Sequence, residues 1–309
     1  MTRSVTSIAR VAWPWLLGLA IIVAIATRVP LAAFRDAIHE GPHVRLLAVD
    51  AAVGIASLFA DTFATWIGLL VMNVKWSLSR TLAVRGATYL LSLINYAVGQ
   101  GGIGFYLHRD GMTGMRAAGV TLFSIGITFA TLLAITVGAW LAGGYTGGTA
   151  LTWTVVGSSI AFVIYLAIIA ARPAALVRRE LLAPLFDAGV GGHVLSVLAR
   201  VPHVSLIVLG HWFALLAWNV PVPFEVAATA LPIVVVAGVL PISPAGLGTI
   251  QAALVYFFSS YAPGPDSDAR AAAILAFAIV HFVYTMVVQL AIGVACIAPA
   301  RRGTPPAQP

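Results

Sequence analysis

Long apolar runs separated by short polar loops fill almost the whole chain. A membrane-spanning helix needs about 20 consecutive apolar residues, and each of these runs approaches or exceeds that length. The pattern predicts an all-α polytopic membrane protein, with a single integral membrane domain over residues 1–300 and a disordered tail over 301–309. The apolar runs cover residues 11–33, 49–72, 81–112, 114–141, 150–171, 201–219, 226–260 and 270–298.

Two of the runs are interrupted by glycine-rich breaks, at residues 99–104 (GQGGIG) and 241–248 (PISPAGLG). A break frees backbone N–H and C=O groups, and these are tolerated at membrane depth only where protein or a water-filled cavity surrounds them. We therefore expect residues 81–112 and 226–260 to form re-entrant helical hairpins, each entering and leaving on one side of the membrane. The alternative is that the glycines only allow neighbouring helices to pack closely.

The distribution of basic residues favours the hairpin interpretation. Cytoplasmic loops of membrane proteins carry an excess of Lys and Arg. If every apolar run crossed the membrane, the basic group over residues 172–200 would lie outside the cell. With two re-entrant hairpins, only Arg28, Arg35, Arg45 and Arg270 stay outside, and both termini lie in the cytoplasm.

The same assignment divides the chain into two repeats, over about 11–141 and 150–298, each with the order span, span, hairpin, span. The first hairpin would open toward the cytoplasm and the second away from it, so the repeats would have inverted topology. Residues 101–104 and 245–248 align at an offset of 144. Inverted repeats with broken helices are typical of transporters that bind substrate near the middle of the bilayer. The predicted fold therefore has six spanning helices and two re-entrant hairpins.

Composition excludes several classes of protein. The 309 residues are 61% hydrophobic and 9% charged, which leaves too little polar sequence for a soluble domain. Topology and anionic lipid headgroups explain the net charge of +7 better than nucleic acid does. Cys296 is the only cysteine, and the sequence shows no zinc-ligand spacing, hydrolase triad or P-loop, so we expect no cofactor, metal or enzymatic activity. The run Val11–Thr27 has features of a signal peptide, but the topology needs it as a retained first span.

The hairpin breaks are the candidate substrate site. Helix N-termini direct free N–H groups and a positive dipole toward the break, which suits phosphate or carboxylate, while the ends of the preceding helices present carbonyl groups that suit a cation. Arg109 would bind a headgroup phosphate through its planar guanidinium, unless it belongs to a surface charge group with His108 and Asp110. The predicted substrate-binding residues are Asn95, Gln100, Gly102, Gly104, Arg109, Ser243, Gly246, Gly248 and Gln251.

Ionisable side chains inside the apolar runs form a second set of candidates. Asp61 lies near the middle of a run, where a carboxylate is costly and is usually functional or paired. We expect Asp61 and His211 to couple protons to transport. The alternatives are a protonated Asp61 side chain hydrogen-bonded to a neighbouring helix and a neutral, packed histidine. His281 is a further candidate, whereas Asp50 and Arg85 are placed at the membrane interfaces.

Two segments of the chain resemble a known family. Residues 95–102 (NYAVGQGG) and 240–249 (LPISPAGLGT) resemble the transmembrane, flippase-like region of lysylphosphatidylglycerol synthase, the multiple peptide resistance factor family. The resemblance would cover residues 11–298, without the soluble domain that transfers the aminoacyl group. Gln251 stands where that family usually carries a glutamate. The resemblance implies translocation of a lipid rather than its synthesis.

The leading functional hypothesis is a multi-pass lipid flippase of the bacterial inner membrane. It would translocate an anionic or phosphate-containing headgroup, carried by a phospholipid or a polyprenyl-phosphate-linked lipid, through a cavity between the two hairpins. The sequence leaves two alternatives open: an ion-coupled carrier of a small anion, and a non-transporting membrane subunit of a cell-envelope enzyme complex. A homo-oligomer is compatible with each of them.

Overall fold

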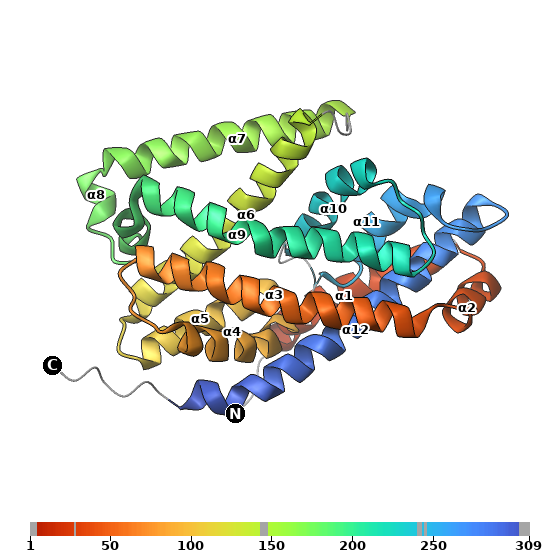
Figure 1. The fold of residues 1–309 in the computed structure, drawn as a ribbon, viewed down its shortest axis with the longest axis horizontal. Coiled ribbons are helices and arrows are strands. Elements are labelled where there is room, and N and C mark those ends of the chain that lie inside the picture. Colours follow the sequence, from red (N-terminus) through yellow and green to blue (C-terminus); the bar gives the residue numbers. More distant parts are fainter. Residues whose placement is uncertain (1–4, 28, 143–147, 240–242, 244–245, 303–309) are drawn as a thin grey trace.

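The computed structural model describes residues 5–27, 29–142, 148–239, 243 and 246–302, and all regular structure within them is helical (Figure 1). This confirms the all-α class. Pro241, Ile242, Pro244 and Ala245 of the second predicted break, and residues 303–309 of the predicted tail, lie outside the described residues. The helices are α1 (Val5–Ala26), α2 (Leu31–His39), α3 (His43–Val71), α4 (Leu78–Ser92), α5 (Tyr96–Arg109), α6 (Gly114–Leu141), α7 (Gly148–Ala171), α8 (Ala174–Val177), α9 (Ala183–Ala217), α10 (Phe224–Val239), α11 (Thr249–Phe258), the 3-10 helix η2 (Ser259–Tyr261) and α12 (Ser267–Arg301).

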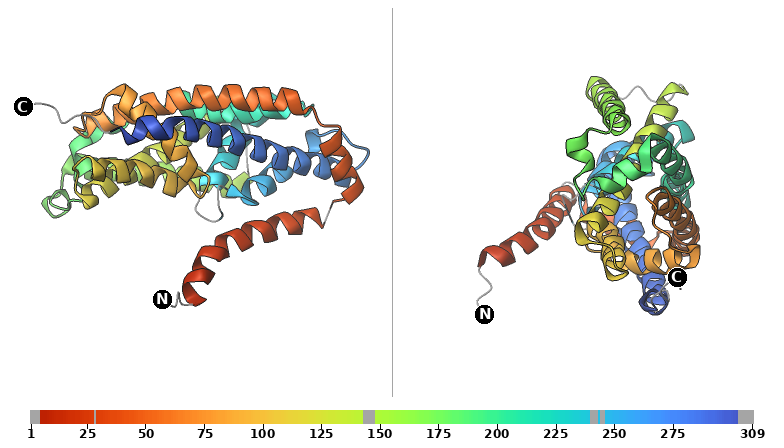
Figure 2. Two further views of the ribbon diagram at one scale, coloured as in Figure 1. Left: turned by 90° about the horizontal axis from the view of Figure 1, so that it is seen from below. Right: turned by 90° about the vertical axis from the view of Figure 1, so that its left-hand side faces the viewer.

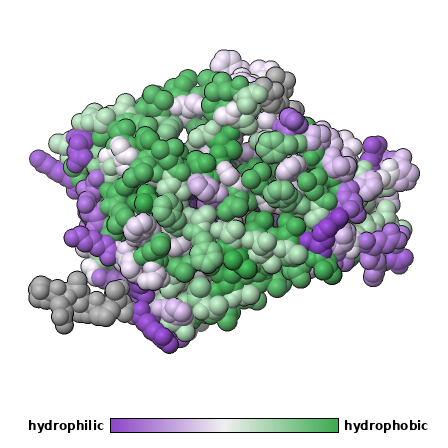
Figure 3. Space-filling view, viewed as in Figure 1, coloured by the Kyte–Doolittle hydropathy of each residue, from purple (hydrophilic) through white to green (hydrophobic). Residues whose placement is uncertain are grey.

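Five helices in the described part of the chain are long and apolar enough to cross a membrane: α3, α6, α9, α12 and residues Thr152–Ala171 of α7. Leu16–Ala26 of α1 and the whole of α2 would together make a sixth, but they run in different directions (Figure 2) and meet at an angle of 104°. Apolar side chains cover the middle of the face in Figure 3, and hydrophilic ones gather toward its two ends. These features are compatible with a multi-pass membrane protein.

The span predicted over residues 201–219 is longer in the structure. Helix α9 runs from Ala183 to Ala217, and Arg200 is buried inside it. The helix bends at Gly189, which has φ 59° and ψ 179°, a conformation that side-chain-bearing residues avoid. The sequence prediction began this span after Arg200 and counted Arg200 with the basic group at the cytoplasmic side. The structure instead pairs that charge with a carboxylate on α3.

Helices α4 and α5 form a helical hairpin that is joined by Leu93, Ile94 and Asn95. With 15 and 14 residues, they are about 22 and 21 Å long, which is shorter than a hydrocarbon core of about 30 Å. The predicted break at 99–104 is wrong, because these residues lie within α5. The helix starts earlier since the Asn95 side chain caps it, accepting a 2.7 Å hydrogen bond from the Ala97 N–H.

This hairpin begins and ends at the same end of the molecule. One hollow is lined both by Met72–Trp76, which precede α4, and by Asp110–Thr113, which follow α5. Arg80 near the start of α4 also forms an ion pair with Asp110 at 3.2 Å. The chain therefore leaves and returns on one side of the bundle at α4–α5.

Helices α10 and α11 pack against each other as a second pair, with 16 and 10 residues. Gly246 and Gly248 have φ angles of 74° and 85°, and Gly248 is the N-cap of α11. The structure thus confirms a break between α10 and α11 at residues 246–248, which directly precede α11. Gly18 of α1 packs on this turn so closely that an added β-carbon would lie 2.7 Å from the Leu247 carbonyl oxygen.

Helices α3 and α9 pack together in opposite directions and end in the same motif. Arg45 near the start of α3 donates a 2.7 Å hydrogen bond to the Ala217 carbonyl at the end of α9, which shows that the two helices are antiparallel. The Trp66 indole N–H donates a 3.1 Å hydrogen bond to the Trp76 carbonyl, ten residues later in the chain. The Trp212 indole N–H donates a 2.9 Å hydrogen bond to the Val222 carbonyl, again ten residues later. Asn73 and Asn219 follow with φ angles of 60° and 63°. These pairs align at an offset of 146, and the Trp…Asn-Val repeat was missed in the sequence.

The two glycine-rich motifs, unlike the two Trp…Asn-Val motifs, do not occupy equivalent places in the two halves of the chain. Residues 101–104 lie inside α5, whereas Gly246 and Gly248 precede α11. The linker between α4 and α5 has three residues, and the chain between Val239 and Thr249 is longer. The alignment at an offset of 144 therefore pairs positions that are not equivalent in the fold.

Two apolar clusters hold the bundle together, one around each helix pair. The first contains side chains of α9, α10, α11 and α12, such as Leu231 and Phe277, and the second contains side chains of α3, α4, α5 and α6, such as Val84 and Ile103. Each of these four side chains is at most 2% exposed. Side chains of the first cluster, such as Val204 and Val235, also line the polar cavity described next.

Candidate functional site

A cavity of about 280 Å³ lies in the middle of the bundle. Its walls come from α3, α4, α5 and α6 of the first half of the chain and from α9, α10, α11 and α12 of the second. Both helix pairs therefore contribute to it. The polar side chains in its wall are Asp50, Ser57, Asp61, Arg85, Tyr89, Ser92, Tyr96, Thr128, His203, His211, His281, Thr285 and Gln289.

Asp61 on α3 is the centre of a buried ionic cluster. Arg85 on α4 donates through Nε to Asp61 Oδ2, and Arg200 on α9 donates through Nη1 to Asp61 Oδ1 at 3.0 Å. His203 Nε2 lies 3.8 Å from the same Oδ1. The side chains of Asp61, Arg85 and Arg200 are 1%, 5% and 3% exposed. One carboxylate thus joins three helices.

Hydroxyl groups complete much of this cluster. Arg200 Nη2 donates to Thr65 Oγ1 at 3.3 Å, and Arg85 Nη1 donates to Thr88 Oγ1 at 3.3 Å. Arg200 Nε is buried and has no hydrogen-bonding partner among the residues that the structure describes. A buried donor without a partner is costly, so a ligand or water that accepts from it would be favoured.

The charges of this cluster do not balance. Arg85 and Arg200 place two guanidinium groups around the single carboxylate of Asp61. Buried charges are stable only when they are paired, so the excess positive charge favours an anion in the adjoining cavity. Arginine also presents a planar set of donors that matches phosphate and carboxylate oxygens.

A second polar group occupies another part of the cavity wall. Asp50 on α3 lies with Oδ1 at 2.9 Å from His281 Nδ1 on α12. The His211 ring on α9 packs edge-on against His281 with ring centroids 4.9 Å apart. His281 also stacks on Phe277 at 5.3 Å, with an interplanar angle of 7°. This second group again joins three helices, and both carboxylates come from α3.

The spacing of polar residues explains why these side chains share one cavity. On α3, Asp50, Ser57 and Asp61 are seven and four residues apart, so they lie on one face of the helix. On α4, Arg85 and Ser92 repeat the seven-residue spacing, and both line the cavity. The sequence prediction placed Asp50 and Arg85 at interfaces because it considered their position along each run rather than their face.

Asp61 and His211, the predicted proton-coupling residues, both line the cavity. Both oxygens of Asp61 accept bonds from guanidinium groups on other helices, so Asp61 is an ion-paired carboxylate and not the protonated side chain of the alternative. His211 Nδ1 lies 2.8 Å from the carbonyl oxygen of Ile207 in its own helix. The sequence prediction missed Arg85 and Arg200 as site residues. It placed both outside the membrane interior, whereas the structure buries both side chains inside the bundle.

Arg109 lies at one end of the bundle, away from this cavity. Its Nη2 donates a 2.8 Å hydrogen bond to the Arg301 carbonyl, and its guanidinium lies 5.5 Å from the centre of the Tyr106 ring. The contacts agree with the alternative of a surface charge group at the membrane boundary. Asn95 serves as the N-cap of α5.

The predicted glycines of α5 pack against neighbouring helices. A β-carbon on Gly102 would lie 2.7 Å from side-chain atoms of Leu91 and Thr88, and one on Gly104 would lie 3.2 Å from the Ala117 carbonyl of α6. These contacts favour the close-packing alternative for both positions. Gln100 is 1% exposed, and its Oε1 has no partner among the described residues.

The predicted residues of the second break lie beside the cavity. Gln251 Oε1 accepts a 2.6 Å hydrogen bond from the Gly248 N–H, so this side chain caps α11. Ser243 is 1% exposed, and its Oγ has no partner in the described part of the chain. The neighbours of the break, Val239 and Ile250, line the cavity directly.

An apolar groove of about 620 Å³ lies next to the cavity, between α6, α7, α9 and α10. Its wall includes Leu122, Phe129 and Val236, and it shares Leu132 with the polar cavity. In the same groove the Tyr165 hydroxyl lies 2.7 Å from His193 Nε2. The polar cavity and the apolar groove thus both border Leu132 of α6.

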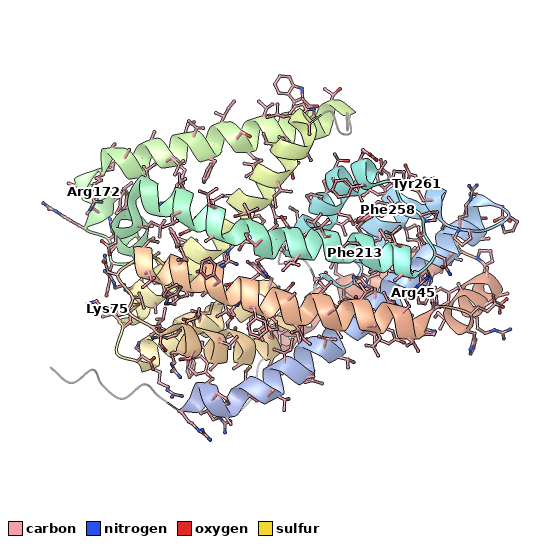
Figure 4. The ribbon with its side chains drawn as sticks, viewed as in Figure 1. Arg45, Lys75, Arg172, Phe213, Phe258 and Tyr261 are labelled. Atoms are coloured by element: carbon pink, nitrogen blue, oxygen red, sulfur yellow. The ribbon has the colours of Figure 1, made fainter. Side chains whose placement is uncertain are left out.

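The two ends of the bundle differ in charge. Lys75 and Arg172 lie at one end in Figure 4, and Arg45 lies at the other. Three more arginines lie at the first end. Arg80 forms an ion pair with Asp110, and Arg116 forms one with Asp187. Arg109 donates a hydrogen bond to the Arg301 carbonyl. Basic residues therefore concentrate where the loops before α4, after α5 and before α9 meet.

Among the residues that the structure describes, no group of three or more His, Cys, Asp or Glu side chains could hold a metal ion. Comparison with protein-family models, curated proteins and solved structures finds no match to this chain.

Proposed function

We propose that this protein translocates a lipid with an anionic, phosphate-containing headgroup across the bacterial inner membrane. The headgroup would enter the central cavity, and Arg85 in its wall would bind the phosphate in place of the predicted Arg109. The single observation that carries the proposal is the buried cluster of two guanidinium groups around the one carboxylate of Asp61, of which Asp61 and Arg85 line a cavity inside an apolar bundle. Ionisable groups at such depth usually mark a substrate or ion pathway.

The cavity has room for a headgroup. Its volume of about 280 Å³ corresponds to on the order of nine water molecules, at roughly 30 Å³ for each. Tyr89, Tyr96 and Thr128 add hydroxyl groups to the wall, and the Tyr96 hydroxyl donates to Thr128 Oγ1 at 2.9 Å. Such groups can exchange hydrogen bonds with phosphate or glycerol oxygens.

The adjoining groove favours a lipid over a small soluble anion. An acyl chain needs an apolar path beside the headgroup chamber, and the groove of about 620 Å³ supplies one across Leu132. A carrier of a small soluble anion needs no such groove, so this observation supports a lipid as the substrate.

We further propose that the two halves form inverted repeats, in which α4–α5 and α10–α11 are re-entrant hairpins. The support is the antiparallel packing of α3 and α9, which end in the same Trp…Asn-Val motif. The basic end of the bundle would face the cytoplasm, following the positive-inside rule. The resemblance of the glycine-rich segments to the lysylphosphatidylglycerol synthase membrane region supports the same class of function.

The test is a translocation assay in proteoliposomes. Purified protein is reconstituted with trace fluorescent phosphatidylglycerol, phosphatidylcholine or a labelled polyprenyl phosphate, and dithionite reports the fraction of label on the outer leaflet. We expect movement of the two anionic lipids, phosphatidylglycerol and the polyprenyl phosphate, that falls at least tenfold in Arg85→Lys, because lysine keeps the charge but loses the planar donor set. Arg116→Lys, in an ion pair that is about one-third exposed, is the matched control. Absence of movement for both anionic lipids, or equal rates in Arg85→Lys and wild type, would refute the proposal.

A further inference from the structure

The group formed by Asp50, His211 and His281 has no part in binding the phosphate as described above. Its three side chains come from α3, α9 and α12 and line the same cavity as Arg85. Asp50 and His281 are 6% and 8% exposed. Their arrangement calls for a separate explanation.

Atoms able to accept a proton remain available in this group. Asp50 Oδ2 is buried and has no partner among the described residues. His281 Nδ1 approaches Asp50 Oδ1 at 2.9 Å, which is an ion-pair distance if the imidazole is protonated. The Phe277 ring, stacked on His281, holds that imidazole in place. Asp61 differs, since guanidinium groups occupy both of its oxygens.

The tautomer of His211 follows from its backbone contact. A carbonyl oxygen can only accept, so the Nδ1 atom that lies 2.8 Å from the Ile207 carbonyl must carry a hydrogen. The lone pair of His211 is therefore on Nε2. This leaves one basic imidazole nitrogen on a ring that contacts His281 and lines the cavity.

We propose that Asp50, His281 and His211 form a proton-binding site, and that a proton and the anionic headgroup bind the cavity together and cross the membrane in the same direction. The inference rests on the proposed function, because it names what drives that movement. It moves the predicted coupling role from Asp61 to Asp50 and His281 and keeps His211 in that role.

The coupling between the two ligands is electrostatic. Asp50 and Asp61 are eleven residues apart on α3, so the two groups are separated by about 16 Å along the helix axis. At an effective dielectric constant near 20, a proton and a monoanion at that distance strengthen each other's binding about fivefold. By reciprocity, the headgroup raises the occupancy of the proton site by the same factor.

Other titratable and charged groups face this site from the helices around it. On the side of α10, α11 and α6, the described cavity wall is made of residues without titratable groups, such as Val235, Ile250 and Thr128. One turn beyond His281, the Tyr284 hydroxyl lies 2.9 Å from His43 Nδ1. The groups that share the cavity are Asp61, Arg85, Tyr89, Tyr96 and His203.

The experiment measures lipid and proton movement in the same vesicles. Phosphatidylcholine proteoliposomes contain trace fluorescent phosphatidylglycerol, read out by dithionite, and lumenal pyranine, which reports pH. In wild type we expect an acidic exterior to accelerate inward movement of the labelled lipid about fivefold, with acidification of the lumen. Asp50→Asn, His281→Gln and His211→Gln should lose both effects of the gradient and keep lipid exchange at equal pH.

His39→Gln, at the exposed end of α2, is the matched control and should behave as wild type. His211→Gln keeps the inference testable if the other variants do not fold, because the hydrogen bond of His211 within the described residues goes to a carbonyl of its own helix.

The possible failures are distinguishable. Lipid movement that ignores the gradient and leaves lumenal pH unchanged would overturn the proton site while the proposed function stands. Proton entry without lipid movement, lost in the three variants, would overturn the proposed function and keep the proton site. If neither moves, both are wrong. Equal loss in His39→Gln, or no loss in any of the three variants, would also overturn the inference.

Discussion

Replacing Asp61 with asparagine tests the ionic cluster on which the site depends. Asparagine keeps the shape of the side chain but removes its charge, so Arg85 and Arg200 would stay buried without a counter-ion. Removing one partner of a buried ion pair typically costs about 3–5 kcal/mol. Coulomb's law gives a similar size, since two charges 4 Å apart contribute about 4 kcal/mol at an effective dielectric constant of 20. We therefore expect Asp61→Asn to lower the free energy of unfolding by about 3–5 kcal/mol.

The assay is reversible unfolding of the purified protein in mixed micelles, with SDS as the denaturant and circular dichroism as the signal. Asp187→Asn is the matched control, because Asp187 pairs with Arg116 at 2.6 Å but both side chains are about one-third exposed. That variant should lose only about 0–1 kcal/mol. The double variant Asp61→Asn/Arg200→Gln should lose less than the sum of its parts, by about 0.5–3 kcal/mol, because one uncompensated charge has been removed.

A loss below about 1 kcal/mol in Asp61→Asn, equal to that of the exposed pair, would refute this reasoning. It would mean that water reaches the two guanidinium groups and that the cluster is not a desolvated site. Strict additivity in the double variant would lead to the same conclusion, because it would show that Asp61 and Arg200 do not interact.

Three further predictions concern the packing around the site. Gly104→Val should destabilise the α5–α6 contact by about 1–3 kcal/mol in the same unfolding assay, since the space beside Gly104 is already filled, whereas Gly101→Ala, which has open space, should be nearly neutral. Gln251→Ala should cost about 0.5–2 kcal/mol through loss of the α11 cap, and Gln251→Glu should keep most of that stability. Trp66→Phe and Trp212→Phe should each lower the free energy of unfolding by about 0.5–1.5 kcal/mol, because each removes one indole hydrogen bond to a carbonyl. If the two losses differ by more than twofold, the two tryptophans do not have equivalent roles in the two halves.

The length and composition of the apolar runs were enough to predict helices and their approximate number. A backbone in hydrocarbon must satisfy its own hydrogen bonds, so a run of this kind has almost no other stable conformation. The prediction was least accurate where it located helix ends from charge and glycine. Arg200 does not end a helix because Asp61 neutralises it, and the glycines of residues 99–104 do not break one because Asn95 starts α5 before them.

What the sequence determined by itself is therefore local: apolar helices, a break before α11, and ionisable side chains within apolar spans at Asp61 and His211. Which residues meet in the cavity was decided only by the tertiary structure. Arg85 and Arg200 are 115 positions apart in the chain, and each is bound to Asp61 only because α3, α4 and α9 pack together. The physical reason is that a buried charge is stable only beside its partner, and a partner on another helix leaves no signal in the local sequence.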